Sequence, residues 1–199
     1  MTREEKNEAL FAAVKKGDLE AVKKLIASGA QVDAKNNGDS QPLHCAAYSG
    51  HLPVAKYLVE ERGAQVDGKN NGGRQPLHCA AYSGYLPVVK YLIEERGAGV
   101  DAKDNGDWQP LHEAAYSGHL PVVKYLVEER GARVDAKNNA GKTPVELAGS
   151  HPATLKFLQG WASPEKAEEM RRASFGKMAA GVIVRQRQLG SLRPKGPAL

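Results

Sequence analysis

Apolar residues recur at helical spacing along residues 72–105, and two prolines mark where helices begin. Pro76 suits the first turn of a helix, because the N–H that proline lacks has no intrahelical partner there. The pattern predicts a short helix that ends at Gly84 and a longer helix that begins at Pro87 and ends near Gly97. The apolar positions are Leu77, Ala80 and Ala81 in the first helix and Leu86, Val88, Val89, Leu92 and Ile93 in the second.

The same stretch occurs three times. Residues 38–71, 72–105 and 106–139 align without gaps at a period of 34, and neighbouring copies differ at 8 and at 7 positions. Periods of this length indicate repeat arrays. One unit alone cannot bury its apolar face, so the units are expected to stack in a row. Between helix pairs, Asn71-Gly72 tolerates two residues with positive φ, which predicts a tight hairpin tip.

Three motifs recur in phase along the chain. They are Pro-Leu-His-x-Ala-Ala at 42–47, 76–81 and 110–115, Gly-His-Leu at 50–52 and 118–120, and Gly-Ala-x-Val-Asp at 63–67, 97–101 and 131–135. In these motifs, residues 5–161 resemble the ankyrin repeat family. The resemblance implies an all-α solenoid of helical hairpins, with β-turn fingers and a concave binding face lined by fingers and first helices. Glu60-Glu61-Arg62 is one residue longer than is usual in the family, which explains the period of 34.

The resemblance also predicts the domain organisation. The ankyrin repeat domain spans 1–162, with an N-terminal capping unit at 1–33, repeats at 34–67, 68–101 and 102–135, and a truncated C-terminal unit at 136–162. Residues 163–199 follow as a C-terminal helix and a basic, partly disordered tail. Ser163-Pro164 has the N-cap and first-turn residues of a helix, which is expected to run to about Ala180.

Charge is distributed unevenly. The net charge is +5, but the residues after Glu169 contain seven cations and no acid, so residues 1–169 carry −2. No apolar run approaches the roughly 18 residues of a membrane-spanning helix, and the polar start predicts no secretory signal. Two cysteines do not make a disulfide framework. We therefore expect a monomeric protein of the cytoplasm or the nucleus.

Candidate chemistry is sparse. A spacing of 34 residues places His44, His78 and His112 in different units, about 10 Å apart, whereas zinc needs its ligands within about 2 Å of one ion. The family resemblance makes these histidines structural, with hydrogen bonds between repeats. Cys45 and Cys79 are separated in the same way, beyond the reach of a disulfide. No phosphate-binding loop or nucleophile motif occurs, so we expect no enzyme, metal or cofactor.

The residue before each Gln-Pro or Thr-Pro differs between otherwise copied units and is therefore free of the demands of the fold. These residues are Ser40, Arg74, Trp108 and Lys142. By resemblance they face the concave surface, and a tryptophan flanked by two cations is typical of interaction hot spots. The alternative is that Trp108 packs along its own finger.

Tyrosines form two further series. Tyr48, Tyr82 and Tyr116 lie near the ends of the first helices and are followed by Ser49, Ser83 and Ser117. They offer rigid contact area to a partner, or they stack on one another and shield the helices. The series Tyr57, Tyr91 and Tyr125 lies inside the second helices and is expected to pack there.

Two classes of function remain open. The first is a non-enzymatic protein–protein interaction module or adaptor, with Arg74 and Lys142 favouring an acidic partner. The second is a nucleic-acid or anionic-membrane binder that acts through the basic tail, although only Phe175 is available there for base stacking. Arg171-Arg172-Ala173-Ser174 resembles a kinase site, which makes Ser174 a candidate for phosphorylation.

Overall fold

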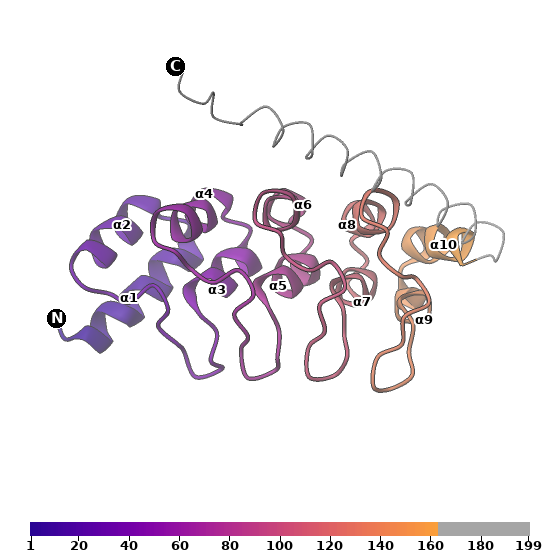
Figure 1. The fold of residues 1–199 in the computed structure, drawn as a ribbon, viewed down its shortest axis with the longest axis horizontal. Helices are drawn as coiled ribbons and strands as arrows, with labels where there is room; N and C mark the ends of the chain where they lie inside the picture. The colour runs from indigo at the N-terminus through magenta and orange to yellow at the C-terminus, as the bar shows by residue number, and fades with distance from the viewer. Residues whose placement is uncertain (163–199) are drawn as a thin grey trace, which may run out of the picture.

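The computed structural model describes residues 1–162, which form five consecutive pairs of helices (Figure 1). The helix expected from Pro164 to Ala180, the basic tail and Ser174 lie outside the described residues. The helices are α1 (Arg3–Lys16), α2 (Leu19–Ala27), α3 (Pro42–Ser49), α4 (Leu52–Lys56), α5 (Pro76–Ser83), α6 (Leu86–Lys90), α7 (Pro110–Tyr116), α8 (Leu120–Lys124), α9 (Pro144–Leu147) and α10 (Pro152–Trp161).

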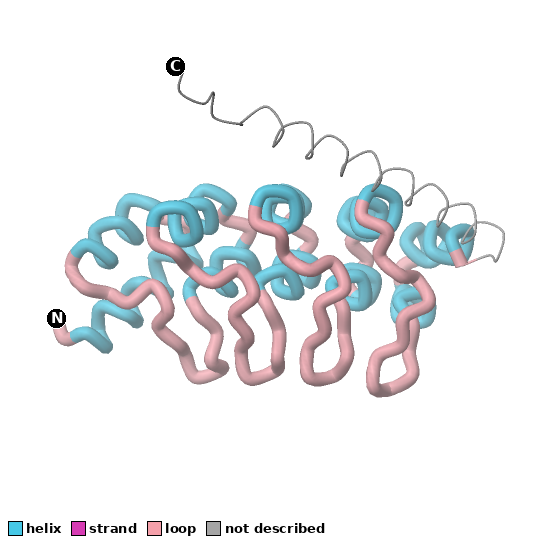
Figure 2. The backbone as a smooth tube through the Cα atoms, in the orientation of Figure 1, coloured by secondary structure: helices cyan, strands magenta, loops and turns pink. Residues whose placement is uncertain are grey.

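The molecule is layered. The helices α2, α4, α6 and α8 lie in the upper row of Figure 1, and the first helices of the pairs lie between that row and the fingers. The fingers project as side-by-side loops, and residues 1–162 contain no strand (Figure 2). None of the helices within residues 1–162 is both long and apolar enough to cross a membrane. The fold expected from the repeat pattern, an all-α solenoid, is therefore the observed one.

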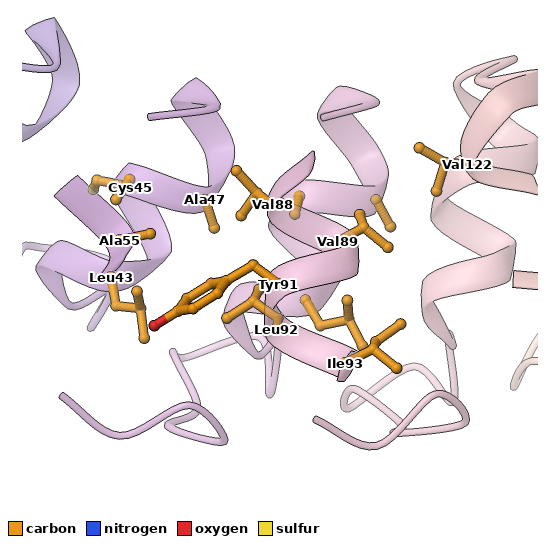
Figure 3. Close-up of a cluster of buried hydrophobic side chains, with 14 of the residues drawn as sticks. Leu43, Cys45, Ala47, Ala55, Val88, Val89, Tyr91, Leu92, Ile93 and Val122 are labelled. Carbon is orange, nitrogen blue, oxygen red and sulfur yellow. The ribbon is translucent and has the colours of Figure 1, made fainter. Parts of the chain in front are cut away.

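Each pair buries its apolar side chains against the next pair. Leu43, Leu77 and Leu111 occupy the same position in the three copies and are at most 1% exposed. Figure 3 shows one junction, where the Tyr91 ring of the second copy reaches toward Leu43 of the first. Burying one such leucine contributes roughly 1.5–3 kcal/mol, and the contribution recurs once per unit.

Three buried histidines join each first helix to the next unit. The Nε2 atoms of His44, His78 and His112 lie 3.0–3.1 Å from the backbone oxygens of Arg74, Trp108 and Ala136, respectively. Each Nδ1 accepts the backbone N–H of the glutamine three residues earlier, which leaves Nε2–H as the donor. Burial lowers the pKa of all three imidazoles, so the neutral form is favoured.

A second histidine series joins the units at the C-terminal ends of the first helices. The Nε2 atoms of His51, His119 and His151 lie 2.8–3.0 Å from the backbone oxygens of Lys15, Tyr82 and Tyr116. The second copy has Tyr85 at this position, and a Cβ added to Gly50 would collide with its ring. This series was not predicted from the sequence, although His51 and His119 are 68 residues apart, which is two repeat lengths.

The fingers turn differently from the prediction. Asn70 Oδ1 accepts the backbone N–H groups of Gly72 and Arg74, both at 3.0 Å, and Gly73 N–H donates to Asn70 O. These bonds close a turn followed by one left-handed residue, Gly73, whose φ is 73°. The tight turn has Asn71 and Gly72 as its central residues, as expected. The two positive φ angles expected there are wrong, because the turn is held by the Asn70 side chain and the left-handed residue is Gly73. The equivalent left-handed residues are Asp39, Asp107 and Gly141.

Neighbouring fingers are hydrogen-bonded to one another at their tips. The backbone N–H of Asn71, Asn105 and Asn139 donates to an oxygen of the preceding finger at 2.9–3.1 Å. The side chain of Asn105 also donates to Asn71 O, at 2.9 Å. The fingers are thus held side by side even though they lack strands.

The extra residue of each copy is absorbed at the end of the second helix. Residues Tyr57–Glu61, Tyr91–Glu95 and Tyr125–Glu129 form π-helical turns, which accommodate one added residue in a helix. The three tyrosines that begin these turns are at most 7% exposed, as the second tyrosine series was expected to be. Lys56 of the first copy lies 5.1 Å from the centre of the Tyr91 ring and pairs with Glu95 at 3.3 Å.

Replacing Asp39 or Asp107 with glycine is expected to stabilise the protein by up to about 1 kcal/mol each, because a left-handed φ strains any residue with a Cβ. Their φ values are 55° and 58°, and the lost ion pairs with Lys35 and Lys103 are exposed ones of little energy. Urea denaturation would measure the change.

The reverse substitutions provide the control. A Cβ on Gly73 would lie 2.7 Å from the backbone nitrogen of Asn105, whereas one on Gly141 meets nothing within 4 Å. Gly73→Asp should therefore destabilise the protein much more than Gly141→Asp. Lower urea midpoints for the Asp39→Gly and Asp107→Gly variants would contradict the account of the turn.

Candidate interaction surface

The fingers at 36–40, 70–74, 104–108 and 138–142, together with α3, α5 and α7, form what we call the finger-side face. It carries the residues predicted from the sequence to contact a partner. Ser40, Arg74 and Trp108 are half-buried where the fingers meet the helices, and Lys142 is exposed. Ser49, Ser83 and Ser117 are half-buried at the ends of the first helices.

The three tyrosines of this face are not equivalent. Tyr48 and Tyr116 are 55% and 51% exposed, and Tyr82 is half-buried. The rings of Tyr48 and Tyr82 stack with centroids 6.1 Å apart, whereas Tyr116 packs edge-on against Trp108 at 5.7 Å. The rings therefore pack in pairs and still leave aromatic surface open to solvent.

Trp108 is held between its own finger and helix α7. Its backbone N–H donates to Asp104 Oδ1 at 2.8 Å, and its ring lies 6.1 Å from the ring of His112. A Cβ on Gly106 would lie 3.2 Å from the indole. Part of the ring thus packs along the finger, as the alternative interpretation held, and part of it remains accessible.

Arg74 is engaged inside the array. Its Nη2 lies 2.7 Å from Glu113 Oε1, and its Nε lies 3.6 Å from Asp104 Oδ2. The guanidinium also lies 5.8 Å from the centre of the Tyr82 ring. Two carboxylates therefore face one guanidinium, so Arg74 has ion-pair partners within the protein.

Glu113 is the functional candidate that the sequence analysis missed. It is 0% exposed and occupies the position of Cys45 and Cys79 in the other copies. Burial raises its pKa to about 7, although Arg74 opposes the shift. Neither of its oxygens receives an aligned hydrogen bond among the described residues. The signal was present in the sequence, because the third copy replaces a cysteine with an acid.

The cysteines are unsuited to reaction. Cys45 is buried, Cys79 is half-buried, and both are free thiols. Burial raises the pKa of both, that of Cys79 to about 12, so the thiolate is scarcely populated. No cluster of three metal-ligating side chains occurs within residues 1–162.

A hollow lies at the N-terminal end of the array, between α1 and the first finger. Its lining includes Glu8, Phe11, Lys15, Lys35 and Ser40. Acids and bases both line it, so it presents no single charge. The sequence analysis did not identify it, because the capping unit lacks the repeated motif.

The Arg74–Glu113 contact generates a prediction about stability. Arg74→Ser should destabilise the protein by about 2–3 kcal/mol, because it leaves a buried carboxylate without its cation. Adding Glu113→Cys should restore most of the loss, because the double variant then has a serine and a cysteine at these two positions. Ser40 and Cys79 are the residues at the equivalent positions one repeat earlier, where the same fold forms. Urea denaturation of both variants would measure the coupling.

The same pair of variants should differ in their response to pH. The pKa of Glu113 is raised in the folded protein, so its favourable contribution is present below about pH 4.5 and is lost as the pH rises through about 7. The cost of Arg74→Ser should therefore be greater at pH 8 than at pH 6. A cost that does not change with pH, or that persists after Glu113→Cys, would contradict this account.

The repeated units match the models of a known protein family. A family model described as ankyrin repeats (3 copies) matches residues 10–104, and one described as ankyrin repeats (many copies) matches residues 82–127 and 111–159. Comparison with curated proteins gives no significant match. The matched residues lie within the five stacked helix pairs, and the chain therefore belongs to the ankyrin repeat family.

Proposed function

We propose that this protein is a non-enzymatic adaptor that binds a protein partner on its concave surface, the finger-side face. Ankyrin repeats generally mediate protein–protein interactions. The observation that carries the proposal is the exposure of Tyr48 and Tyr116 on this face. Apart from Met1 and Tyr85, they are the exposed large hydrophobic side chains of residues 1–162.

Exposed tyrosines are favourable contact residues. Their rings are rigid, so little conformational entropy is lost on binding, and each ring pairs an apolar face with a hydroxyl. Here the rings are pre-positioned, because Tyr48 stacks on Tyr82 and Tyr116 packs on Trp108. Pre-organised aromatic residues are typical of hot spots in protein interfaces.

The two cysteines bear on the cellular compartment of the protein. Free, unreactive thiols suit a reducing compartment, so we expect the protein in the cytoplasm or the nucleus. The alternative function, binding of nucleic acid or anionic membrane through the basic tail, depends on residues outside those described. The two functions make opposite predictions for substitutions on the face and in the tail.

A pull-down from native lysate with the full chain tests the proposal. Tyr48→Ala/Tyr116→Ala should reduce capture of the dominant partner about tenfold or more, because truncating a hot-spot residue costs 2 kcal/mol or more. The control is Glu61→Ala/Glu128→Ala, which alters exposed residues at the ends of the second helices and should leave capture unchanged.

A third variant tests the tail. Arg185→Gln/Arg187→Gln/Arg193→Gln should retain the partner if the finger-side face binds it. Loss of the partner in this variant, with capture intact in the tyrosine variant, would overturn the proposal in favour of a tail-driven function with a steep dependence on salt.

A further inference from the structure

Three sets of equivalent positions occur where the fingers meet the first helices of the following copies, and we call each set a junction. Each contains a residue at the base of one finger, a residue of the next finger and a residue of the next first helix. In chain order the junctions are Ser40/Asn70/Cys79, Arg74/Asp104/Glu113 and Trp108/Asn138/Leu147. We call Arg74, Asp104 and Glu113 the middle junction.

The middle junction alone among these three is built from charged side chains. In the first junction Asn70 Nδ2 donates to Ser40 Oγ at 3.3 Å, and the cysteine is a neutral thiol. In the middle junction all three positions change together, and the new residues contact one another, with Arg74 against both carboxylates. The fold does not require the charges, because the same fold forms the first junction without them. A buried ion pair is also a poor source of stability.

The charge set of the middle junction is incomplete. Glu113 is 0% exposed, and apart from the ion pair of its Oε1 with Arg74 at 2.7 Å, neither carboxylate oxygen receives an aligned hydrogen bond from residues 1–162. The titratable groups that face it are Arg74 and Asp104 on the fingers and Cys79 on α5. Asp104 is occupied by the N–H groups of Gly106 and Trp108. When Glu113 is ionised, two acids and one base leave an excess of negative charge. A further cation would balance it, and without one burial and the neighbouring Asp104 raise the pKa of Glu113 to about 7.

Aromatic rings lie beside the charged residues of the middle junction. Tyr82 lies beneath the Arg74 guanidinium, and Trp108, which follows Asp104 in the same finger, packs against the exposed Tyr116. The faces of such rings attract cations, and the alkyl stem of lysine or arginine packs well on them. Acid and aromatic groups together therefore favour a basic side chain.

We propose that the middle junction is the specificity-determining subsite of the finger-side face, and that it takes a lysine or arginine side chain from an extended segment of the partner. The inference rests on the proposed function, since it concerns the same face. It replaces the acidic partner expected from the sequence with a basic one, because Arg74 is neutralised by Asp104 and Glu113. It also fixes the register of a partner along three nearly identical units.

Selection from a phage-displayed library of random 12-residue peptides tests the proposal with the full chain as bait. The matched variant is Arg74→Ser/Asp104→Asn/Glu113→Cys, which rebuilds the middle junction as a copy of the first. Circular dichroism and urea denaturation would show that the variant is folded. Wild type should enrich peptides with a lysine or arginine at one fixed position.

The affinity of an enriched peptide gives the quantitative readout. The triple variant should bind it about tenfold or more weakly, as should a peptide with the basic residue changed to alanine, since a charge-assisted contact contributes about that much. Binding to wild type should weaken from pH 8 to pH 6, as Glu113 takes up a proton. The inverse variant, Ser40→Arg/Asn70→Asp/Cys79→Glu, should add a second site for the same peptide.

Three results would overturn the inference. They are an acidic or uncharged consensus, a basic consensus that the triple variant retains, and no enrichment at all. In the first two cases, peptides that Tyr48→Ala/Tyr116→Ala no longer binds would leave the proposed function standing. If that variant also captures the lysate partner normally, both proposals fail.

Discussion

The structure depends on one constraint: a helix pair can bury its apolar face only against the next pair. Leu43, Leu77 and Leu111 are all buried because each unit packs against neighbouring helix pairs built on the same pattern. The bonds between units follow from this stacking. The imidazole of His44 reaches Arg74 O only when the second unit is seated. The repetition of the sequence is thus the chemical requirement of a continuous core.

The extra residue shows how strictly the units must match. An insertion in one copy alone would shift its second helix relative to its neighbours. All three copies carry the insertion, and each absorbs it as a π-helical turn at the same place. The contacts between units are therefore preserved, and Lys56 over Tyr91 repeats as Lys90 over Tyr125. These pairs join the second helices of neighbouring units in the same way along the array.

The sequence predicted what periodicity controls. The helices, their proline starts and the stacking follow from the spacing of apolar residues and breakers, and the extra residue was recognised from the resemblance to the ankyrin family. The finger turn could not be predicted in this way, because the side chain of Asn70 chooses between turn types with similar sequences. The contact of Arg74 with Glu113 joins residues of different copies that are separated in sequence by a helix pair and a finger. Only a comparison of the copies, position by position, would have brought the two together.

The middle junction is the feature that most clearly distinguishes one unit of the array from the next. In an array of identical junctions, an extended partner would bind equally well in several registers, because each shift by one unit restores the same contacts. The first and middle junctions share a backbone, yet only the middle one carries charge. Burying Glu113 costs stability that Cys79 in the same environment does not. A cost accepted at one junction alone is best explained by recognition, because specificity needs a site that its neighbours cannot imitate.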